Sequence, residues 1–374
     1  MESAKNAIST AFGHPFYVMA KPVGSRCNLA CSYCYYLPKK QGFLDERLLE
    51  TFIRQYLEAQ TSAEVLFTWH GGEPLLLPVS YYERALQLQQ KYASGRHIDN
   101  CLQTNGTLIT DEWCEFFRRN NFLIGISIDG PEALHNCYRA QFDRVLRGIE
   151  LLKKHGVMWN AMATVNHRNA DETDVFYQFF KEIGCEYLQF TPVVEQTDGH
   201  ITPESVTPDQ WGRFLCRLYD LWIREDVGRL FVQLFDATLA NWVGQPPAVC
   251  SMSALCGLAP ALQPDGRLYS CDHFVFPEYC LGSIQSQTIT EMMYSEQQQR
   301  FGRQKLDALA RSCRKCTWLF ACHGECPKNR ILPGGENYLC KGYRQFFSHA
   351  APTMDLMAAE LAAGRAPANV MDML

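Results

Sequence analysis

The seventeen cysteines of this 374-residue chain constrain its fold more than any other feature. Three of them, Cys27, Cys31 and Cys34, are spaced C-x3-C-x2-C, and most of the others lie in the last third. The polar start of the sequence carries no export signal, and no later run approaches the ~18 apolar residues of a membrane span. We therefore expect a cytoplasmic protein, in which thiols stay reduced and clustered cysteines bind metal rather than form disulfides.

Up to about residue 192, short apolar runs alternate with longer amphipathic segments. The spacing predicts strands at 16–21, 65–69, 97–103, 123–128, 158–165 and 187–190, and helices at 46–60, 80–92, 111–120, 142–155 and 171–183. Capping residues such as Asp111 and Asp171 are expected to begin two of these helices. Six βα units in succession predict an α/β fold, with a parallel sheet curled into a full or partial (β/α)6 barrel.

The composition changes after the sixth unit. Residues 193–207 have the character of a connector, and a helix that opens with a proline is expected to run to about residue 226. Beyond it, short strands and turns are punctuated by cysteines until a final helix at about 343–363. These changes predict three parts, which are a barrel with its connector helix over 1–235, a small metal-stapled domain over 236–342 and a helical tail over 343–374.

The first three cysteines directly follow the first expected strand, at the end of the barrel where such enzymes carry their chemistry. Three thiolates are one too few for a closed zinc site or for all four irons of a [4Fe–4S] cube. One iron would stay open for a ligand from outside the protein; an open zinc site is the alternative. Tyr33, Tyr35 and Tyr36 crowd this loop, either to shield a cluster or to pack.

The tetrapeptide Gly71-Gly72-Glu73-Pro74 follows the second expected strand. Its glycines let the backbone approach a ligand closely, and Glu73 offers an acceptor for an ammonium group. Together, the cysteine triplet and this tetrapeptide resemble the radical S-adenosylmethionine (radical SAM) superfamily. The resemblance implies a [4Fe–4S] cluster on the triplet, with S-adenosylmethionine on its open iron and against the four residues of the tetrapeptide.

Further strand-end residues match positions where this superfamily lines the nucleoside and ribose. By that resemblance the cofactor contacts include Asn105, Ser127, Asp129 and Phe190. Asn-Gly and Asp-Gly pairs are also plain turn formers, which is their alternative role. Arg139 is able to make a bidentate ion pair with the cofactor carboxylate; a solvated arginine at a helix end is the alternative.

Eight cysteines of the last third make two full sets of four. Four thiolates saturate a cube, which can then carry electrons or brace the fold but cannot bind a substrate; two structural zinc sites are the alternative. The spacing resembles the SPASM extension of radical SAM enzymes. That likeness implies one auxiliary [4Fe–4S] cluster on Cys250, Cys256, Cys271 and Cys326, and a second on Cys313, Cys316, Cys322 and Cys340, so that the chain would hold three clusters.

An acid, Asp272, directly follows one of these cysteines, on a segment that the second domain could present to the barrel. A partly desolvated carboxylate there could accept a proton from a substrate thiol or hydroxyl; a surface or supporting aspartate is the alternative. The motifs FTWHGGEP (67–74), LQTNGT (102–107), CDHF (271–274) and CHGECPK (322–328) sharpen the resemblance to the anaerobic sulfatase-maturating enzymes. In that family the acid at this place is the proposed base.

The resemblance implies oxidation of a Cys or Ser in an unfolded sulfatase segment to Cα-formylglycine, without oxygen. A 5′-deoxyadenosyl radical would remove hydrogen from the substrate Cβ, Asp272 would take the side-chain proton, and an auxiliary cluster would take an electron. Tyr36 and His70 match positions that face the substrate, although Gln is also common where His70 stands. A flavodoxin or ferredoxin of low potential would supply electrons.

Other functions remain open at this point. A SPASM enzyme that forms thioether or carbon–carbon links in a small peptide would share every cluster, and a zinc-stapled binding protein would share the cysteines. The net charge of −5 indicates neither nucleic acid nor a membrane as partner. Two connections, 138–142 and 193–207, are shorter than the family pattern, which points to trimmed loops or to residues missing from the sequence.

Overall fold

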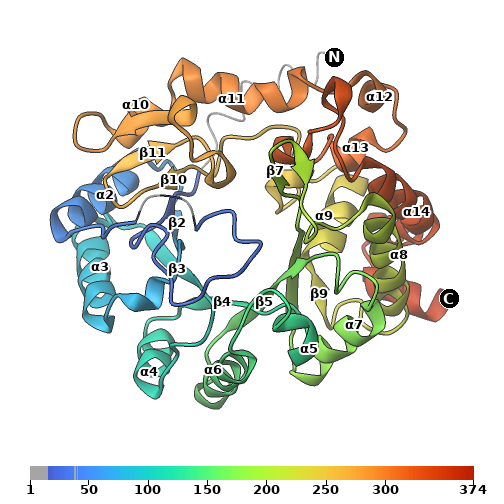
Figure 1. Ribbon diagram of the computed structural model, residues 1–374, viewed down its shortest axis with the longest axis horizontal. Helices are drawn as coiled ribbons and strands as arrows, with labels where there is room; N and C mark the ends of the chain where they lie inside the picture. The colour runs from blue at the N-terminus through green and yellow to red at the C-terminus, as the bar shows by residue number, and fades with distance from the viewer. Residues whose placement is uncertain (1–15, 38, 40) are drawn as a thin grey trace.

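A ten-stranded curved sheet forms the centre of the computed structural model, which describes residues 16–37, 39 and 41–374 (Figure 1). Its strand order is β12-β11-β10-β1-β2-β3-β4-β5-β6-β9. The first six strands pair in parallel, and they are β1 (Met19–Ala20), β2 (Glu64–Trp69), β3 (His97–Thr104), β4 (Leu123–Ser127), β5 (Trp159–Val165) and β6 (Tyr187–Pro192). The predicted α/β fold with a partial barrel is confirmed.

Helices cover the outer face of these strands, as Figure 1 shows. They are α2 (Glu46–Ala59), α3 (Val79–Tyr92), α4 (Asp111–Arg119), α5 (Glu132–His135), α6 (Phe142–His155) and α7 (Thr173–Glu182). Two expected caps are wrong. Thr110, and not Asp111, caps α4, because the Thr110 side chain accepts a hydrogen bond from the Trp113 amide. Helix α7 begins only at Thr173, and the Asp171 carboxylate accepts a hydrogen bond from Gln210 instead of capping this helix.

The apolar stripe of each helix packs against the strands and fixes the sheet. Between α2, β2 and α3 the core is aromatic, and its buried rings, which meet edge to face or stacked, belong to Phe52, Tyr56, Phe67, Trp69 and Tyr82. Burial of each such ring stabilises the fold by roughly 1.5–3 kcal/mol. The carboxyl ends of the strands are thereby held rigidly, and the loops that follow them carry the candidate site.

The connector contains more regular structure than expected. It holds a small hairpin of β7 (Gln196–Thr197) and β8 (His200–Ile201), followed by α8 (Pro208–Glu225), β9 (Phe231–Val232) and α9 (Gln233–Trp242). Strand β9 pairs in parallel with β6 and extends the barrel by a strand that the sequence pattern did not reveal. A capping box begins α8, in which Thr207 and Gln210 exchange hydrogen bonds with each other's backbone.

The cysteine-rich part continues the same sheet on its other edge. Strand β10 (Ala261–Leu262) pairs in parallel with β1, and β11 (Arg267–Tyr269) and β12 (Cys280–Ser283) follow as antiparallel neighbours. The turn between β10 and β11 is Pro264-Asp265-Gly266, in the region where short strands and turns were expected. The two parts therefore share backbone hydrogen bonds, and their exact boundary stays a prediction.

The remaining helices surround these strands. The α-helices are α10 (Ile289–Met293), α11 (Glu296–Asp307), α12 (Arg311–Arg314), α13 (Leu319–Cys322) and α14 (Cys340–Ala362). The short 3₁₀ helices are η1 (Pro74–Leu76), η2 (Cys250–Met252), η3 (Asp272–Phe274), η4 (Pro277–Tyr279), η5 (Pro327–Asn329), η6 (Pro333–Gly335) and η7 (Pro367–Met373). Helix α14 packs so closely on α8 that a Cβ on Gly342 would lie 2.5 Å from the Pro208 oxygen. Within the described residues, none of the helices has the length and apolar character that crossing a membrane requires.

Candidate active site

The first three cysteines lie on one loop that leaves β1. Cys31 is buried, and Cys27 and Cys34 are half-buried. Burial raises the pKa of the Cys31 thiol; Arg139 opposes this rise, and the other two thiols add to it. The three sulfurs are therefore close enough to repel one another when they are thiolates. Bound iron, which is positively charged, would relieve this repulsion.

The two glycines of the tetrapeptide bring this loop against the end of β2. A Cβ on Gly72 would lie 2.0 Å from the Arg26 carbonyl oxygen, and Gly71 has a φ of +131°, which favours glycine. The amide groups of Gly72 and Glu73 donate to the carbonyls of Gly24 and Arg26. The close approach that glycine permits here is thus to the cysteine loop itself.

The Glu73 carboxylate is fully buried and joins β2 to the end of β3. One oxygen accepts the Leu75 amide at 2.9 Å and the Thr104 hydroxyl at 2.7 Å, and the other accepts the Asn105 amide at 2.8 Å. Burial raises the pKa of Glu73 to about 7, and these hydrogen bonds oppose the rise. Glu73 therefore joins the tetrapeptide to the end of β3, and its contact with a cofactor stays a prediction.

Three predicted contact residues surround the cysteine loop. The Asn105 amide lies 3.7 Å from the Cys27 sulfur. The guanidinium of Arg139 donates to Asp129 at 3.0 Å and lies 4.0 Å from the Cys31 sulfur. The Tyr33 hydroxyl donates to the same Asp129 carboxylate, which is fully buried. Arg139 is therefore held by an ion pair rather than solvated at a helix end.

Two other predicted contacts behave differently. Ser127 is buried at the end of β4. The Phe190 ring packs against Trp211 and Phe214 of α8 and Phe235 of α9, on the helix-covered face of the sheet. Because side chains alternate between the two faces of a strand, Phe190 points away from the cysteine loop, and its expected cofactor contact has no support in this geometry.

The carboxylate of Asp272 lies where the second part meets the barrel. Its Oδ1 lies 2.7 Å from the Lys21 ammonium, and its Oδ2 accepts the Tyr35 hydroxyl at 2.5 Å. Burial by itself would raise the pKa of Asp272, but the Lys21 charge, with His70 and His273 as further causes, holds the pKa below its usual range. Asp272 is thus a buried carboxylate with both oxygens held, directly after Cys271.

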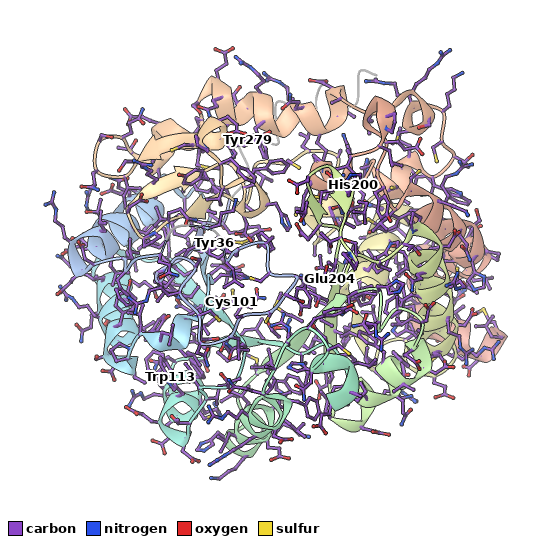
Figure 2. All side chains as sticks on the ribbon, in the orientation of Figure 1. Tyr36, Cys101, Trp113, His200, Glu204 and Tyr279 are labelled. Atoms are coloured by element: carbon purple, nitrogen blue, oxygen red, sulfur yellow. The ribbon has the colours of Figure 1, made fainter. Side chains whose placement is uncertain are left out.

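His70 and Tyr36 lie beside the same lysine. His70 Nδ1 is 2.6 Å from Lys21 Nζ and accepts the Gly71 amide at 2.7 Å. Burial, and next the Lys21 charge, lower the pKa of His70 to about 3, so the ring is neutral. The Tyr36 ring lies 4.7 Å from Lys21 Nζ, and its hydroxyl donates to Gln263. Figure 2 shows Tyr36 toward the inside of the curved sheet, with Glu204 across from it.

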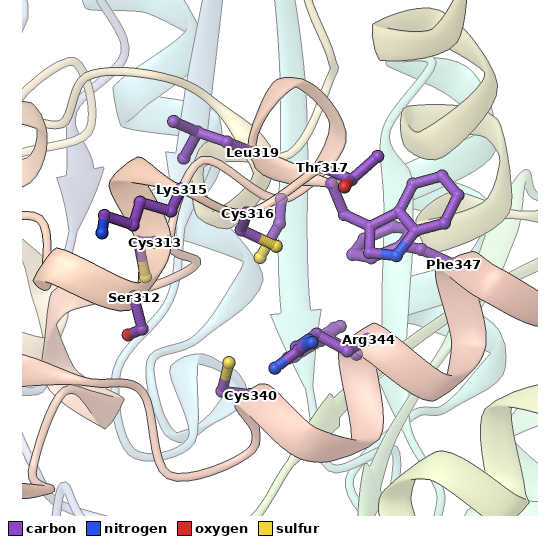
Figure 3. Close-up of a pocket in the computed structure, with 13 residues that line it drawn as sticks. Ser312, Cys313, Lys315, Cys316, Thr317, Leu319, Cys340, Arg344 and Phe347 are labelled. Atoms are coloured by element: carbon purple, nitrogen blue, oxygen red, sulfur yellow. The ribbon is translucent and has the colours of Figure 1, made fainter.

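Four cysteines of the second part line a cavity of about 300 Å³. They are Cys313, Cys316, Cys322 and Cys340, and the wall also includes Trp318, Arg344 and Phe347. Figure 3 shows the sulfurs of Cys313, Cys316 and Cys340 turned toward the same space. Burial and neighbouring acids and thiols raise the pKa of Cys322 to about 12 and that of Cys340 to about 11. The donor set and the space fit a four-thiolate cluster.

The other four cysteines form a second group nearer the barrel. Burial raises the pKa of Cys326, and its further causes are Glu325, Cys271 and Cys250. Burial likewise raises the pKa of Cys256 to about 11, with a contribution from Cys250. Each of these thiols thus interacts with members of its own predicted set. Among the described residues, no group of three or more His, Cys, Asp or Glu side chains converges as the ligands of a single metal ion do.

Comparison with known proteins agrees with this geometry. Residues 22–180 match the radical SAM superfamily, and residues 259–317 match the SPASM iron–sulfur cluster-binding domain. The serine-type anaerobic sulfatase-maturating enzyme of Bacteroides thetaiotaomicron is 53% identical over 97% of this chain and 96% of its own length. The chain belongs to the anaerobic sulfatase-maturating enzymes.

Other relatives of this sulfatase-maturating family member are more distant. The cysteine-type enzyme of Clostridium novyi is 31% identical over 92% of this chain and 98% of its own length. The solved structure of native anSMEcpe with bound AdoMet and Cp18Cys peptide has a TM-score of 0.87 and 31% identity, and it covers 93% of this chain and 100% of that one. Streptococcus suis SuiB with its precursor peptide SuiA, at 15% identity and a TM-score of 0.64, shares the fold alone.

Membership in this family confirms several predictions. The radical SAM and SPASM domains carry [4Fe–4S] clusters and use S-adenosylmethionine, so the predicted kinds of cofactor are confirmed. The alternatives of a peptide-crosslinking enzyme and a zinc-stapled binding protein are not favoured. The assignment of individual residues to clusters and substrate remains a prediction.

The sequence pattern missed two residues of the sulfatase-maturating site. Lys21 ends the first apolar run and was not expected to take part in the site. Tyr35 was expected only to shield a cluster or pack, yet its hydroxyl binds Asp272. A lysine within a run of buried strand residues is the one signal that could have drawn attention to Lys21, because lysine is almost never fully buried unless it is paired.

Proposed function

We propose that this chain oxidises a serine of an unfolded sulfatase polypeptide to Cα-formylglycine, with Asp272 as the base. The preference for serine is supported by the higher identity to the serine-type enzyme of B. thetaiotaomicron, 53% against 31% for the cysteine-type enzyme of C. novyi. The observation that carries the proposal is the Asp272 carboxylate, which Lys21 and Tyr35 hold between the barrel and a group of four cysteines.

The residues present fit three clusters and one cofactor. Cys27, Cys31 and Cys34 would hold the first cluster, and the two groups of four cysteines would hold the auxiliary clusters. The backbone of Gly71 and Gly72, together with Asn105, would lie against S-adenosylmethionine. When bound, these groups supply the radical that removes hydrogen from the substrate Cβ and accept the electron that the substrate then loses.

Asp272 completes the balance of this oxidation. The serine side chain loses one hydrogen atom from Cβ, one proton from Oγ and one electron, and its C–O bond becomes the C=O bond of an aldehyde. The proton passes to a carboxylate oxygen of Asp272, whose pKa below the usual range keeps it unprotonated at neutral pH. Tyr36 and His70, which flank the same lysine, would position the target side chain.

The residues around the first cysteine loop would orient and shield the cofactor. Arg139, fixed by Asp129 and Tyr33, presents a cation near Cys31 that suits the cofactor carboxylate. We also propose that a low-potential flavodoxin or ferredoxin in the cytoplasm supplies the electrons, because the many free thiols require a reducing compartment.

Anaerobic turnover with paired peptides tests this function. Reconstituted protein, S-adenosylmethionine and reductant are incubated with two sulfatase peptides that differ only in Ser or Cys at the target, and mass spectrometry measures the aldehyde. We expect formylglycine from the serine peptide with the higher kcat/KM. A protein that cleaves the cofactor but forms no aldehyde from either peptide would contradict the proposal.

The Asp272→Asn variant tests the base. An amide of the same shape cannot accept the proton, so 5′-deoxyadenosine should still form while aldehyde falls by at least about 100-fold, the usual contribution of a general base. Asp265→Asn, in the turn before β11, is the matched control and should keep normal aldehyde formation. Aldehyde at the normal rate from Asp272→Asn would remove this residue as base.

A further inference from the structure

Lys21 is a fully buried lysine at the junction of the two parts of the molecule. It follows β1, its amide donates to the Leu262 carbonyl of β10 at 2.9 Å, and its side chain is 0% exposed. Its ammonium group is therefore buried at the junction where β1 of the barrel and β10 of the cysteine-rich part share backbone hydrogen bonds. A buried ammonium group is costly unless it is paired.

The contacts of this ammonium group all belong to the candidate substrate site. Nζ lies 2.7 Å from Asp272 Oδ1, 2.6 Å from His70 Nδ1 and 4.7 Å from the centre of the Tyr36 ring. These partners come from the second part, from the end of β2 and from the cysteine loop. A single side chain thus connects every residue that was predicted to face the substrate.

The same contacts fix the direction of the Asp272 carboxylate. Lys21 holds Oδ1 and Tyr35 holds Oδ2, so rotation of the carboxylate is restrained on both sides. His70 Nδ1 accepts hydrogen bonds from Lys21 and from the Gly71 amide, which leaves the ring hydrogen on Nε2. Lys21 thereby sets the orientation of two side chains at once.

A role in stability alone would not explain this arrangement. Buried ion pairs contribute little net stability, because the cost of removing two charges from water cancels most of their attraction. An ion pair that restrains a catalytic group can instead contribute to rate, since small misplacements of a reacting group are expensive.

We propose that Lys21 is the positioning residue of this enzyme, which holds the Asp272 carboxylate at the barrel mouth for proton acceptance. This inference rests on the proposed function of Asp272 as base. Lys21 itself is not a proton acceptor, because a protonated ammonium group has no free electron pair. It acts through Asp272, with His70 as its second partner.

Three variants test this role, measured with the serine peptide under anaerobic conditions. Lys21→Met keeps an unbranched side chain, one atom shorter, and removes the charge, and Lys21→Arg keeps the charge. Lys39→Met is the matched control, because Lys39 lies near the same loop but donates to the Val275 carbonyl and not to Asp272. Iron content, visible absorbance and melting temperature confirm that each variant is loaded and folded.

We expect Lys21→Met to lower kcat for the aldehyde by at least about tenfold while 5′-deoxyadenosine formation continues, so that more cofactor is consumed per aldehyde. Lys21→Arg should restore most of this loss, and Lys39→Met should show none. In an Asp272→Asn background, Lys21→Met should cause no further loss. A purely structural role would lower cofactor cleavage and aldehyde equally in both backgrounds.

Two outcomes would overturn the inference. One is a Lys21→Met enzyme with normal iron and an aldehyde rate within twofold of the unchanged protein. If Lys21→Met does not fold, Lys21→Gln, which also lacks the charge, decides instead: we expect a lower kcat at unchanged KM, and an unchanged kcat would be the other overturning outcome.

A double-mutant cycle on melting temperature separates this inference from the proposed function. Each single variant, Lys21→Met or Asp272→Asn, leaves an unpaired buried group, so the two losses should not add in the double variant. Additive losses would contradict the ion pair itself. If the unchanged protein forms no aldehyde but the cycle shows coupling, the proposed function fails while the pairing stands.

Discussion

The barrel and the region around α12 are stabilised in different ways. An extended apolar core of aromatic and aliphatic side chains lies between the barrel strands and their helices and continues into the cysteine-rich part. Around α12, in contrast, the buried residues Leu309, Ala310 and Cys313 form a separate small cluster, and four cysteines line the neighbouring cavity. The difference indicates that the barrel folds by burial of apolar surface, whereas the region around α12 depends on its metal cluster.

The sharpest test of this comparison is the loss of the first cluster. Cys31→Ala should abolish cofactor cleavage and aldehyde formation, because an iron loses its thiolate, and should lower iron by about four of about twelve atoms per chain. The far-ultraviolet circular dichroism and the melting temperature should change little, since the barrel core lies outside this loop. Cys137→Ala, at an exposed position after α5, is the control and should keep all activity.

If the barrel unfolds in Cys31→Ala, the claim that the barrel folds by burial of apolar surface would be wrong. In that case the first cluster would support the fold as the auxiliary clusters do. Continued cofactor cleavage would instead contradict the assignment of Cys31 as a ligand.

Loss of a thiolate in the second part should act on structure. In Cys322→Ser, amide hydrogen exchange between residues 310 and 340 should accelerate at least about tenfold, because the segment loses the cluster that joins α12, α13 and the start of α14. The barrel strands should keep their protection. Cys280→Ser, in β12 but outside both sets, is the control. Equal protection in both variants would show that apolar packing suffices here.

Removal of iron from the unchanged protein extends this test. Anaerobic chelation followed by brief proteolysis should cut first between residues 310 and 340 and leave 46–190 intact, as mass spectrometry of the fragments would show. Early cleavage within 46–190 would contradict a barrel that stands without metal.

A glycine at the barrel mouth should have a smaller effect. Gly72→Ala would place a Cβ 2.0 Å from the Arg26 oxygen, so the cysteine loop must move, and we expect a loss of about 1–3 kcal/mol in the free energy of unfolding. Cofactor cleavage should fall as the loop shifts. Gly42→Ala is the control, because its Cβ would only touch the Pro264 side chain at 3.2 Å. Urea unfolding of both variants measures the difference.

The two parts also differ in how well the sequence predicts them. In the barrel, the helix expected at 142–155 is observed with the same bounds. An amphipathic repeat of that length indicates both that the segment is a helix and where it begins and ends. Strand β9 was missed, since two residues carry no periodicity. In the second part, the resemblance to the SPASM extension predicts the two cysteine sets, but only the pairing of β10 with β1 shows how this part joins the barrel.

Side-chain direction was the harder part of the site. Phe190 was expected to touch the cofactor because of its place at a strand end, but its ring faces the helices. The Glu73 oxygens accept from Leu75, Thr104 and Asn105, and the expected acceptance from a ligand stays a prediction. The contacts with Thr104 and Asn105 join residues far apart in the chain, and local pattern does not encode them.

The junction of the two parts permits a last and smallest test, on pH. The pKa of His70 is lowered to about 3 in the folded protein, whereas an unfolded histidine has a pKa near 6.5. Below pH 6.5 the unfolded chain therefore binds a proton that the folded chain does not, so the stability that neutral His70 provides is complete above pH 6.5 and is lost as the pH falls. The slope contributed by this residue is at most about 1.4 kcal/mol per pH unit.

His70→Gln should remove that part of the slope, because glutamine can accept from Lys21 and does not titrate. Anaerobic urea unfolding at pH 7.0 and 5.5 measures it, and the acid sensitivity of the clusters cancels because both proteins contain them. If His70→Gln and the unchanged protein show equal slopes, the junction opens to water before His70 is protonated. The barrel side of this site would then be less rigid than the core of the barrel.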